Sequence, residues 1–523
     1  MSRPASVADR RSCSRWIERR LPTTAAYVAV VLFAAAPARA ALTEAPRLTA
    51  IYDAILEARF DDADARLKQS CPPAPTEACK ALQAVSVWWQ ILLDPDNRAL
   101  DGRLNDLATA AIAASDAWTR REPQRAEAWF YLAGSYAPLV QWRVLRGERL
   151  AAAREGNRIR DALERALRLD STLDDAYFGI GAYHYYADVA PAAAKILRWM
   201  LFLPGGDRVK GLQEMLQARQ RGALLKGEAD YQLHVIYLWY ERKPERAIEL
   251  LEGLDARYPS NPLFLRRLAE VQAEWVHDRP ASAAAWQKLL ERASMGRVHS
   301  PASTEARARL GLATELDELY ETDRAIDVLK PIVDRGSAAT RPLVARAQAQ
   351  LGRAYDRLGE RALAVKAYSA ALDSASDAGQ ATRERAQSGL GQSPNPRITE
   401  AYGLSVDGWR AFERGSLDRA KASLTRAIEL DPADQVAGYR YARVLEAVGD
   451  LVGARRQLER VLATRTAPAV ALAPSYLAYA RLLERAGDRA RAIDAYRYAV
   501  QVVGGGLQTR EEARSALKRL GAS

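Results

Sequence analysis

The carboxy-terminal half of the chain repeats itself every 34 residues, and this period restricts the fold more than any other feature of the sequence. Gly415 and Ala420 return 34 positions later as Gly449 and Ala454, and the pattern of small and large apolar residues extends over 345–503. A unit this short cannot bury an apolar face alone, so neighbouring units must stack on one another. Strand signals are nearly absent. We therefore expect an all-α solenoid of helical hairpins.

The repeated residues resemble the tetratricopeptide repeat (TPR) pattern W-x2-L-G-x2-Y, followed by Gly, Ala, an aromatic residue, Ala and Pro. In 345–378 the matching positions are Leu351, Gly352, Tyr355, Gly359, Ala364, Tyr368 and Ala371. A fainter match is visible in 228–261, in 129–136 and in 177–184. The resemblance implies antiparallel helix pairs in which small residues allow close approach and large residues fill the space between neighbouring hairpins.

The quality of the match divides the chain into consecutive parts. We expect an irregular TPR-like array over 41–300, TPR-like repeats over 301–390, and regular TPR repeats with a carboxy-terminal capping helix over 401–523. The Gly- and Pro-rich stretch 391–400 is the expected hinge or linker, since such residues interrupt helices. The two fainter amino-terminal matches are further apart than one repeat, which predicts a longer helix or an extra turn in 138–156.

The amino terminus has the three-part pattern of an export signal. Arginines precede an apolar stretch at 25–36, and Ala38 and Ala40 provide the small residues that a signal peptidase accepts. We expect residues 1–40 to be a signal peptide cleaved after Ala40, and the mature chain to be periplasmic in a bacterium. The alternative is an uncleaved signal that anchors the chain, although the apolar stretch is shorter than the ~20 residues a spanning helix needs. Membrane association is expected only through such an uncleaved signal.

Cysteine usage agrees with export. Cys13 lies within the predicted signal, which leaves Cys71 and Cys79 in a short Pro-rich loop. Two cysteines in an oxidising compartment usually pair, so we predict a Cys71–Cys79 disulfide, with two free buried thiols as the alternative. Neither histidine nor further cysteine lies nearby in sequence to complete four zinc ligands, so no metal is expected.

No pattern typical of catalysis or cofactor binding occurs in the sequence. The chain has 4 His, none in a metal-ligand spacing, and it lacks a nucleophile elbow, a Walker loop and a dinucleotide fingerprint. The net charge of +11 is interspersed with acidic residues along the expected helices, which is typical of solvated faces, so no nucleic acid partner is expected. We therefore expect no cofactor and no enzymatic activity. The alternative is an enzyme or enzyme subunit whose site lies in 138–156 or in the loop 204–208.

The Pro-Gly-Gly-Asp turn at 204–207 is a distinct local signal outside the clear repeats. Asp207 is placed to cap a helix that begins near Arg208. The turn is open to three interpretations: phosphate binding at that helix terminus, an apolar groove, or a plain turn between hairpins. The surrounding stretch resembles a segment of the eukaryotic inclusion-body clearance family of TPR proteins, through Gly179, Gly181, Pro191, Gly205, Asp207, Arg208, Gly211 and Leu212. This resemblance implies a shared structural element in 179–220, and we carry no activity over from it.

A repeat array without a catalytic constellation favours a scaffold for protein–protein or peptide binding. In the TPR architecture, the first helix of each hairpin lines the concave face. The register of the repeats places on that face Arg353, Tyr402, Trp409, Phe412, Tyr439, Arg443 and Arg481. Arginine pairs well with carboxylates and aromatic rings offer large contact areas, so the expected ligand is an extended peptide or a protein with an acidic group. The alternative is that these side chains only solvate the face or pair with Glu446 and Glu484.

Overall fold

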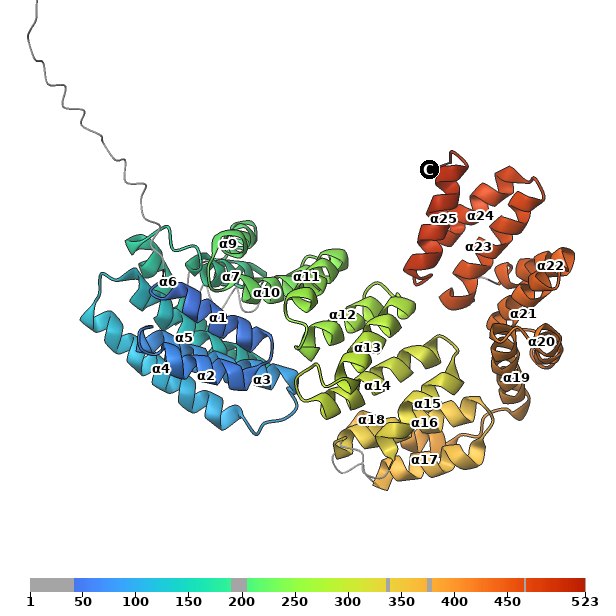
Figure 1. Cartoon of the computed structure of the whole chain (residues 1–523), viewed down its shortest axis with the longest axis horizontal. Coiled ribbons are helices and arrows are strands. Elements are labelled where there is room, and N and C mark those ends of the chain that lie inside the picture. The colour runs from blue at the N-terminus through green and yellow to red at the C-terminus, as the bar shows by residue number, and fades with distance from the viewer. Residues whose placement is uncertain (1–41, 190–204, 335–338, 374–378, 465–466, 523) are drawn as a thin grey trace, which may run out of the picture. The chain divides into compact units, whose positions relative to one another are not determined.

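The computed structural model describes residues 42–189, 205–334, 339–373, 379–464 and 467–522. All regular elements within these residues are helices, and no strand occurs among them (Figure 1). The described chain is thus an all-α solenoid, as the repeat period predicted. The predicted signal peptide at 1–40 lies outside the described residues. Within the described part, no helix is both long and apolar enough to cross a membrane.

The irregular amino-terminal array consists of helices that pack against their neighbours along the chain, such as α5 with α6 and α7 with α9. Its helices are α1 (Ala45–Leu56), α2 (Phe60–Ser70), α3 (Thr76–Leu93), α4 (Asp101–Arg121), α5 (Ala126–Leu145), α6 (Arg149–Leu169), α7 (Ala176–Val189), α9 (Arg208–Arg221), α10 (Lys226–Trp239), α11 (Pro244–Arg257), α12 (Pro262–Glu274) and α13 (Arg279–Ser294). The region 138–156 is the end of α5, a short turn and the start of α6. These helices have 20 and 21 residues, which agrees with the longer helix that the spacing predicted.

The remaining helices form more regular hairpins. They are α14 (Pro301–Glu318), α15 (Thr322–Val333), α16 (Arg341–Arg357), α17 (Arg361–Asp373), α18 (Gln380–Gly391), α19 (Pro396–Glu413), α20 (Leu417–Leu430), α21 (Gln435–Ala447), α22 (Leu451–Leu462), α23 (Ala469–Arg485), α24 (Arg489–Gln501) and α25 (Leu507–Arg519). The last helix, α25, packs on α24 at the position of the expected capping helix. In the stretch predicted as a hinge, 391–400, only residues 392–395 lie between helices, because α19 already begins at Pro396.

The repeated residues account for the geometry of these hairpins. Gly449 follows α21 with a φ of 85°, a left-handed conformation that favours glycine at the end of a helix. Asp450 then caps α22, and its side chain accepts a hydrogen bond from the backbone N–H of Gly453. A Cβ added to Gly408 would lie 2.7 Å from Cγ of Leu424, so glycine allows α19 and α20 to approach closely. The small residues of the pattern therefore have the packing role that the sequence predicted.

The predicted cysteine pair closes the connection between α2 and α3. The sulfur atoms of Cys71 and Cys79 are bonded to each other, and the Cα atoms are 6.4 Å apart. This separation lies within the range that disulfides usually span. The bond therefore joins the end of the first hairpin to the start of the helix that follows it.

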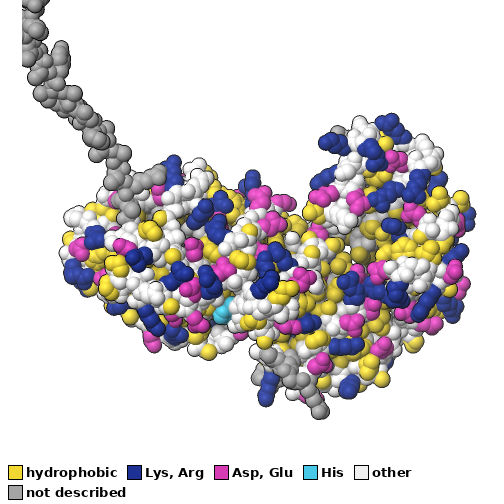
Figure 2. All heavy atoms as spheres, viewed as in Figure 1, with side chains coloured by type: hydrophobic (Ala, Val, Ile, Leu, Met, Phe, Trp, Pro, Cys, Tyr) yellow, Lys and Arg dark blue, Asp and Glu magenta, His cyan; other side chains and the backbone are white. Residues whose placement is uncertain are grey.

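Charged side chains of both signs are interspersed on the molecular face seen in Figure 2. Many of them pair within one helix, as Arg66 does with Asp62 at 3.0 Å and Arg309 with Glu305 at 2.7 Å. Such pairs contribute only about 0.3–0.5 kcal/mol each. The charged helix faces therefore add little to the stability of the fold, which depends on the packing between helices.

Candidate binding surface

The predicted residues of α19 and α21 form an aromatic group, which we call the aromatic patch: Trp409, Phe412 and Tyr439. Trp409 and Phe412 stack on α19 with ring centroids 5.1 Å apart and an interplanar angle of 25°. The ring of Tyr439 on α21 lies 6.4 Å from that of Trp409. All three side chains are half-buried, so each keeps part of its surface open. The repeat register thus brings three predicted residues from two hairpins together.

A buried arginine that the register did not indicate lies beside Trp409. The Arg440 guanidinium is 5.7 Å from the Trp409 ring centroid. It donates hydrogen bonds to Ser405 Oγ at 3.0 Å and to the carbonyl oxygen of Tyr320 at 2.6 Å. Burial lowers the pKa of Arg440 from its ordinary value. Among the described residues its hydrogen-bond partners are neutral, so its charge lacks a directly bonded carboxylate while it holds the indole ring in place.

Arg443 follows Tyr439 by one helical turn. Within the described chain its only close carboxylate is that of Glu446, which also lies near Arg485. The Arg443 Nε atom is 3.4 Å from Glu446, without the geometry of a hydrogen bond. The other oxygen of Glu446 lies 3.3 Å from Arg485. One carboxylate therefore faces two guanidinium groups, which leaves an excess of positive charge beside the aromatic patch. Glu484, which the sequence offered as a second acidic partner, pairs with Arg519 at 2.8 Å.

Two other predicted arginines are paired elsewhere in the array. Arg353 on α16 forms ion pairs with Asp317 and, at 3.2 Å, with Glu318. Arg481 on α23 forms an ion pair with Glu512 of α25. Both arginines join helices of neighbouring repeats, so their charges are already balanced within the protein.

Tyr402 presents little surface, in contrast to the prediction that it lines an open face. Its side chain is only 8% exposed. Its hydroxyl lies 2.6 Å from the Thr322 hydroxyl, and the Arg357 guanidinium lies 4.5 Å from its ring centroid. These partners come from α15 and α16, which cover the ring. Tyr402 therefore stabilises the contact of α19 with the preceding hairpins.

The described part of the loop 204–208 is a capped helix start. Asp207 Oδ1 accepts the backbone N–H of Lys210 at 2.9 Å, which confirms the predicted cap of α9. The backbone N–H of Arg208 donates to Asp188 at 3.1 Å. Side chains of the protein thus occupy two of the N–H groups that a phosphate would need. This geometry favours the interpretation of a plain turn between hairpins.

The region 138–156, the other place considered for an enzymatic site, contains a paired set of charges. Arg143 lies 2.9 Å from Glu155 and 2.5 Å from Glu148. Burial raises the pKa of Glu155, an effect that Arg143 opposes. One arginine that holds two carboxylates is a typical structural pairing. In the described chain, no group of three or more His, Cys, Asp and Glu side chains is placed to hold a metal ion.

The stacked hairpins define a helical-repeat protein, and comparison with known families specifies the repeat. Two tetratricopeptide repeat family models match, one over residues 345–377 and one over 411–474. The first begins within α16 and covers α17, and the second extends from the end of α19 into α23. These stretches are tetratricopeptide repeats, and they support the assignment of the chain as a tetratricopeptide repeat protein.

No curated protein matches the chain. Among solved structures, it is similar to a tetratricopeptide repeat protein from Parabacteroides merdae, with 16% identity, a TM-score of 0.25, and coverage of 55% of this chain and 97% of that one. The TPR domain of P58(IPK) is similar with 15% identity, a TM-score of 0.22, and coverage of 84% and 98%. The TPR2AB domain of yeast Sti1, in a complex with pHSP90, has 15% identity, a TM-score of 0.21, and coverage of 56% and 96%.

Proposed function

We propose that this chain is an extracytoplasmic scaffold that binds a protein, or an extended peptide, carrying an acidic group. Tetratricopeptide repeats indicate a scaffold for protein–protein interaction. The observation that carries the proposal is the aromatic patch together with Arg443 beside it, whose positive charge is only partly neutralised by Glu446. The patch and Arg443 together are the binding surface that we assign.

The chemistry of this surface suits a ligand with a carboxylate next to an apolar group. Half-buried rings lose little side-chain entropy on binding and provide much contact area. The Arg443 side chain is 33% exposed, although its Nε atom is buried and makes no hydrogen bond to Glu446. Glu446 lies near both Arg443 and Arg485, so one carboxylate serves two arginines. A carboxylate from a partner would provide the second negative charge. A basic ligand is disfavoured, because its positive charge would be repelled by these two arginines.

The extracytoplasmic location rests on the export-type sequence at 1–40 and on the cysteine pair, which intact-mass analysis and thiol alkylation test together. We expect the chain recovered from the envelope of its native host to begin at Ala41. Its intact mass should be two hydrogens below that of the reduced chain, and a thiol-alkylating reagent should label Cys71 and Cys79 only after reduction. The closed loop is short, so the bond should add no more than the ~3 kcal/mol of a 15-residue loop. An intact Met1 or full labelling without reductant would contradict the proposal.

The binding surface is tested by removing its ring and its cation together. Peptides selected from a random displayed library on the purified mature chain are expected to be enriched in acidic and large apolar residues. The double change Trp409→Ala with Arg443→Ala should weaken these peptides at least tenfold, or about 1.4 kcal/mol. Fluorescence anisotropy with the synthesised peptides gives the dissociation constants. The double change Trp239→Ala with Arg456→Ala is the control, since Trp239 is 57% exposed on α10 and Arg456 is exposed on α22.

Two outcomes of this experiment speak against the surface. One is unchanged affinity in the Trp409 and Arg443 double variant. The other is equal weakening in the control variant, which would place the peptide elsewhere. A thermal melt of both variants accompanies the titration, because Trp409 is half-buried and contacts Arg440. To separate lost contacts from lost folding, Arg443→Gln alone retains the ring and should still weaken acidic peptides more than neutral ones.

A further inference from the structure

Large apolar side chains are exposed along one edge of the amino-terminal array. In stacked hairpins, the turns inside the hairpins lie along one edge, and the connections between hairpins lie along the other. Among the described residues of α1–α13, seven large apolar side chains are exposed, and six of them lie at the turns of three successive hairpins, α5–α6, α7–α9 and α10–α11 (Figure 1). These six are Val144, Leu145, Leu150, Val209, Trp239 and Tyr240. We call the described segments that carry them, 142–150, 205–210 and 239–245, the turn edge.

Side-chain contacts join the three hairpins near this edge. Arg160 of α6 donates a hydrogen bond to the Tyr183 hydroxyl of α7 at 2.9 Å. Glu241, which follows α10, accepts from the Tyr185 hydroxyl of α7 at 2.7 Å and from Arg208 of α9 at 2.8 Å. The three turns therefore belong to one continuous part of the surface.

The apolar side chains of the turn edge are open to a large degree. Leu150, Val209 and Trp239 are exposed by 69%, 68% and 57%. The Trp239 ring packs edge-to-face on Trp275, with centroids 4.9 Å apart, so its direction is fixed while more than half of the residue stays uncovered. Exposed apolar side chains gathered in one region mark an interaction site, whereas single ones do not.

Basic residues accompany these apolar side chains along the chain. The turn edge contains seven Lys or Arg and four Asp or Glu. Arg143 and Arg146 have carboxylate partners in Glu155 and Asp101, outside the turn edge. The other cations stand beside the exposed apolar positions: Arg149 beside Leu150, Arg208 and Lys210 on both sides of Val209, and Arg242 and Lys243 after Tyr240.

Several of these cations keep an excess of positive charge at the surface. Arg149 and Arg242 are exposed, and the Arg242 guanidinium lies over the Trp275 ring, 5.3 Å from its centroid. Glu241 is only 9% exposed and has two cations beside it, Arg208 at 2.8 Å and Lys243 at 3.7 Å. One largely buried carboxylate thus serves two basic side chains, and the exposed charge of the edge is mainly positive.

This alternation of apolar, aromatic and basic side chains fits a lipid surface. Tryptophan and tyrosine favour the boundary between lipid headgroups and hydrocarbon. Lysine and arginine can lay their stems along apolar surface while their charges reach the phosphates of anionic lipids. The core of a protein interface, in contrast, is depleted in charged residues. Apolar side chains that are separated by cations therefore fit a fluid bilayer better than a folded protein.

We propose that the turn edge binds the surface of an anionic lipid bilayer, so that the amino-terminal array lies on a membrane. The exposed apolar side chains enter the interfacial layer, and the basic side chains pair with lipid phosphates. Within the described chain no helix is long and apolar enough to cross a membrane, so the contact is peripheral. It does not use residues 1–40, and it is separate from the aromatic patch on α19 and α21.

The first test is sedimentation of the purified mature chain with vesicles of phosphatidylglycerol or of phosphatidylcholine. We expect at least tenfold tighter binding to the anionic vesicles, and a loss of this preference as salt is added. The triple change Arg149→Gln with Arg242→Gln and Lys243→Gln should weaken binding to phosphatidylglycerol at least tenfold. Equal binding to both lipids, or no binding of the unmodified chain to phosphatidylglycerol, would overturn the proposal.

The apolar part of the contact is tested by the triple change Leu150→Ser with Val209→Ser and Trp239→Ser. It should weaken binding to phosphatidylglycerol vesicles at least tenfold, because binding strength scales with the apolar area that enters the interface. Thermal melts accompany the measurement, since Trp239 contacts Trp275. If the triple variant does not fold, Leu150→Ser with Val209→Ser keeps the tryptophan pair and should still weaken binding.

The matched control makes the same kind of change away from the turn edge. Met295→Ser with Val452→Ser and Val503→Ser alters side chains that are exposed by 61%, 72% and 72%, and it should leave vesicle binding unchanged. Equal weakening in this control, or unchanged binding in the folded turn-edge variants, would refute the assignment. An envelope protein that binds the unmodified chain without lipid and competes with vesicles for the turn edge would also refute it.

The two proposed surfaces can fail separately. The variant Trp409→Ala with Arg443→Ala should bind vesicles as the unmodified chain does, and the turn-edge variants should keep the affinity for the selected acidic peptides. Loss of vesicle binding in the Trp409 and Arg443 variant would place the lipid contact on the aromatic patch and overturn the assignment to the turn edge.

Discussion

Asp175→Ala is expected to lower the free energy of unfolding of the amino-terminal array by about 3 kcal/mol or more. The side chain is 3% exposed and accepts three backbone N–H groups from the turn between α9 and α10. An unsatisfied buried donor costs about 1–3 kcal/mol. The bond to Leu224 is buried and the bonds to Ala223 and Leu225 are partly buried, so water can compensate only some of the loss. The expected cost is therefore well above that of one hydrogen bond.

Two related variants sharpen this expectation. Asp175→Asn keeps one acceptor oxygen and the same shape, so it should lose less than the alanine variant. Asp174→Ala removes the neighbouring carboxylate, which accepts one hydrogen bond from Gln217 at 2.9 Å, and should cost about 1 kcal/mol. Urea denaturation gives the free energies. Hydrogen exchange at the amides of 223–225 reports the turn itself, since repeat arrays can unfold in parts. Unchanged protection of these amides in Asp175→Ala would show that the carboxylate does not hold the turn.

The repeat pattern was sufficient to predict the residues that meet on successive first helices. Trp409, Phe412 and Tyr439 occupy three different positions of the repeat that are expected on the same face, and their rings lie together on successive first helices. The cap at Asp207 was predictable for a similar reason, because a cap depends only on residues within one turn. Features that are local, or that repeat, can be read from the chain.

Pairings between different helices could not be read in this way. Tyr402 has the right register for an open face, but Thr322 and Arg357 from earlier helices cover it. Arg481 is balanced by Glu512, which the repeat pattern does not reach. The buried Arg440 was missed because arginine on a helix usually lies at the surface. Each case depends on which helices meet, and the register of a single helix contains no such information.

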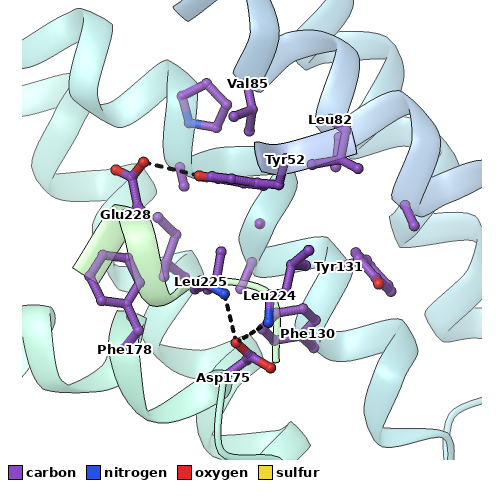
Figure 3. Close-up of a pocket in the computed structure, with 18 of the residues that line it drawn as sticks. Tyr52, Leu82, Val85, Phe130, Tyr131, Asp175, Phe178, Leu224, Leu225 and Glu228 are labelled. Carbon is purple, nitrogen blue, oxygen red and sulfur yellow. Dashed lines mark hydrogen bonds between the residues drawn. The ribbon is translucent and has the colours of Figure 1, made fainter. Parts of the chain in front are cut away.

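A cavity of about 100 Å³ between α1, α3, α5, α6, α7 and α10 (Figure 3) was not predicted, because its walls come from helices distant in sequence. Asp175 and Glu228 are acidic residues, which are rarely buried, yet each is buried and hydrogen-bonded. One local signal was present. Gly134 and Pro138 both disfavour the interior of a helix, yet they lie within α5. Gly134 and Pro138 lie one turn apart, so this part of α5 lacks a side chain at one position and a helical hydrogen bond at the other. Such a pair indicates an irregular environment around the helix.

The Gly-containing stretch at 179–220 gives the second large expected effect, since Gly181 and Gly211 form a close crossing of α7 and α9. A Cβ added to Gly211 would lie 2.5 Å from the Gly181 carbonyl oxygen and 2.6 Å from the backbone nitrogen of Tyr185. A Cβ added to Gly181 would lie 2.6 Å from the Gly211 carbonyl oxygen. The obstructing atoms belong to the backbone, so the two helices must separate to admit even one methyl group. Pro191, another residue of the resemblance in this stretch, lies outside the described residues.

Gly211→Ala should therefore destabilise the array by about 3 kcal/mol, at the upper end of the usual cost of overpacking. The same chemical change at Gly253 on α11 should have the opposite sign. That glycine is exposed and has no atom within 4 Å of an added Cβ, so alanine should gain about 0.5–1 kcal/mol from helix propensity alone. Thermal and urea unfolding of both variants and of the unmodified chain give the sign of each change in the free energy of unfolding. If Gly211→Ala is as stable as Gly253→Ala, the helices do not cross as closely as these distances require, and the glycines of this stretch have another role.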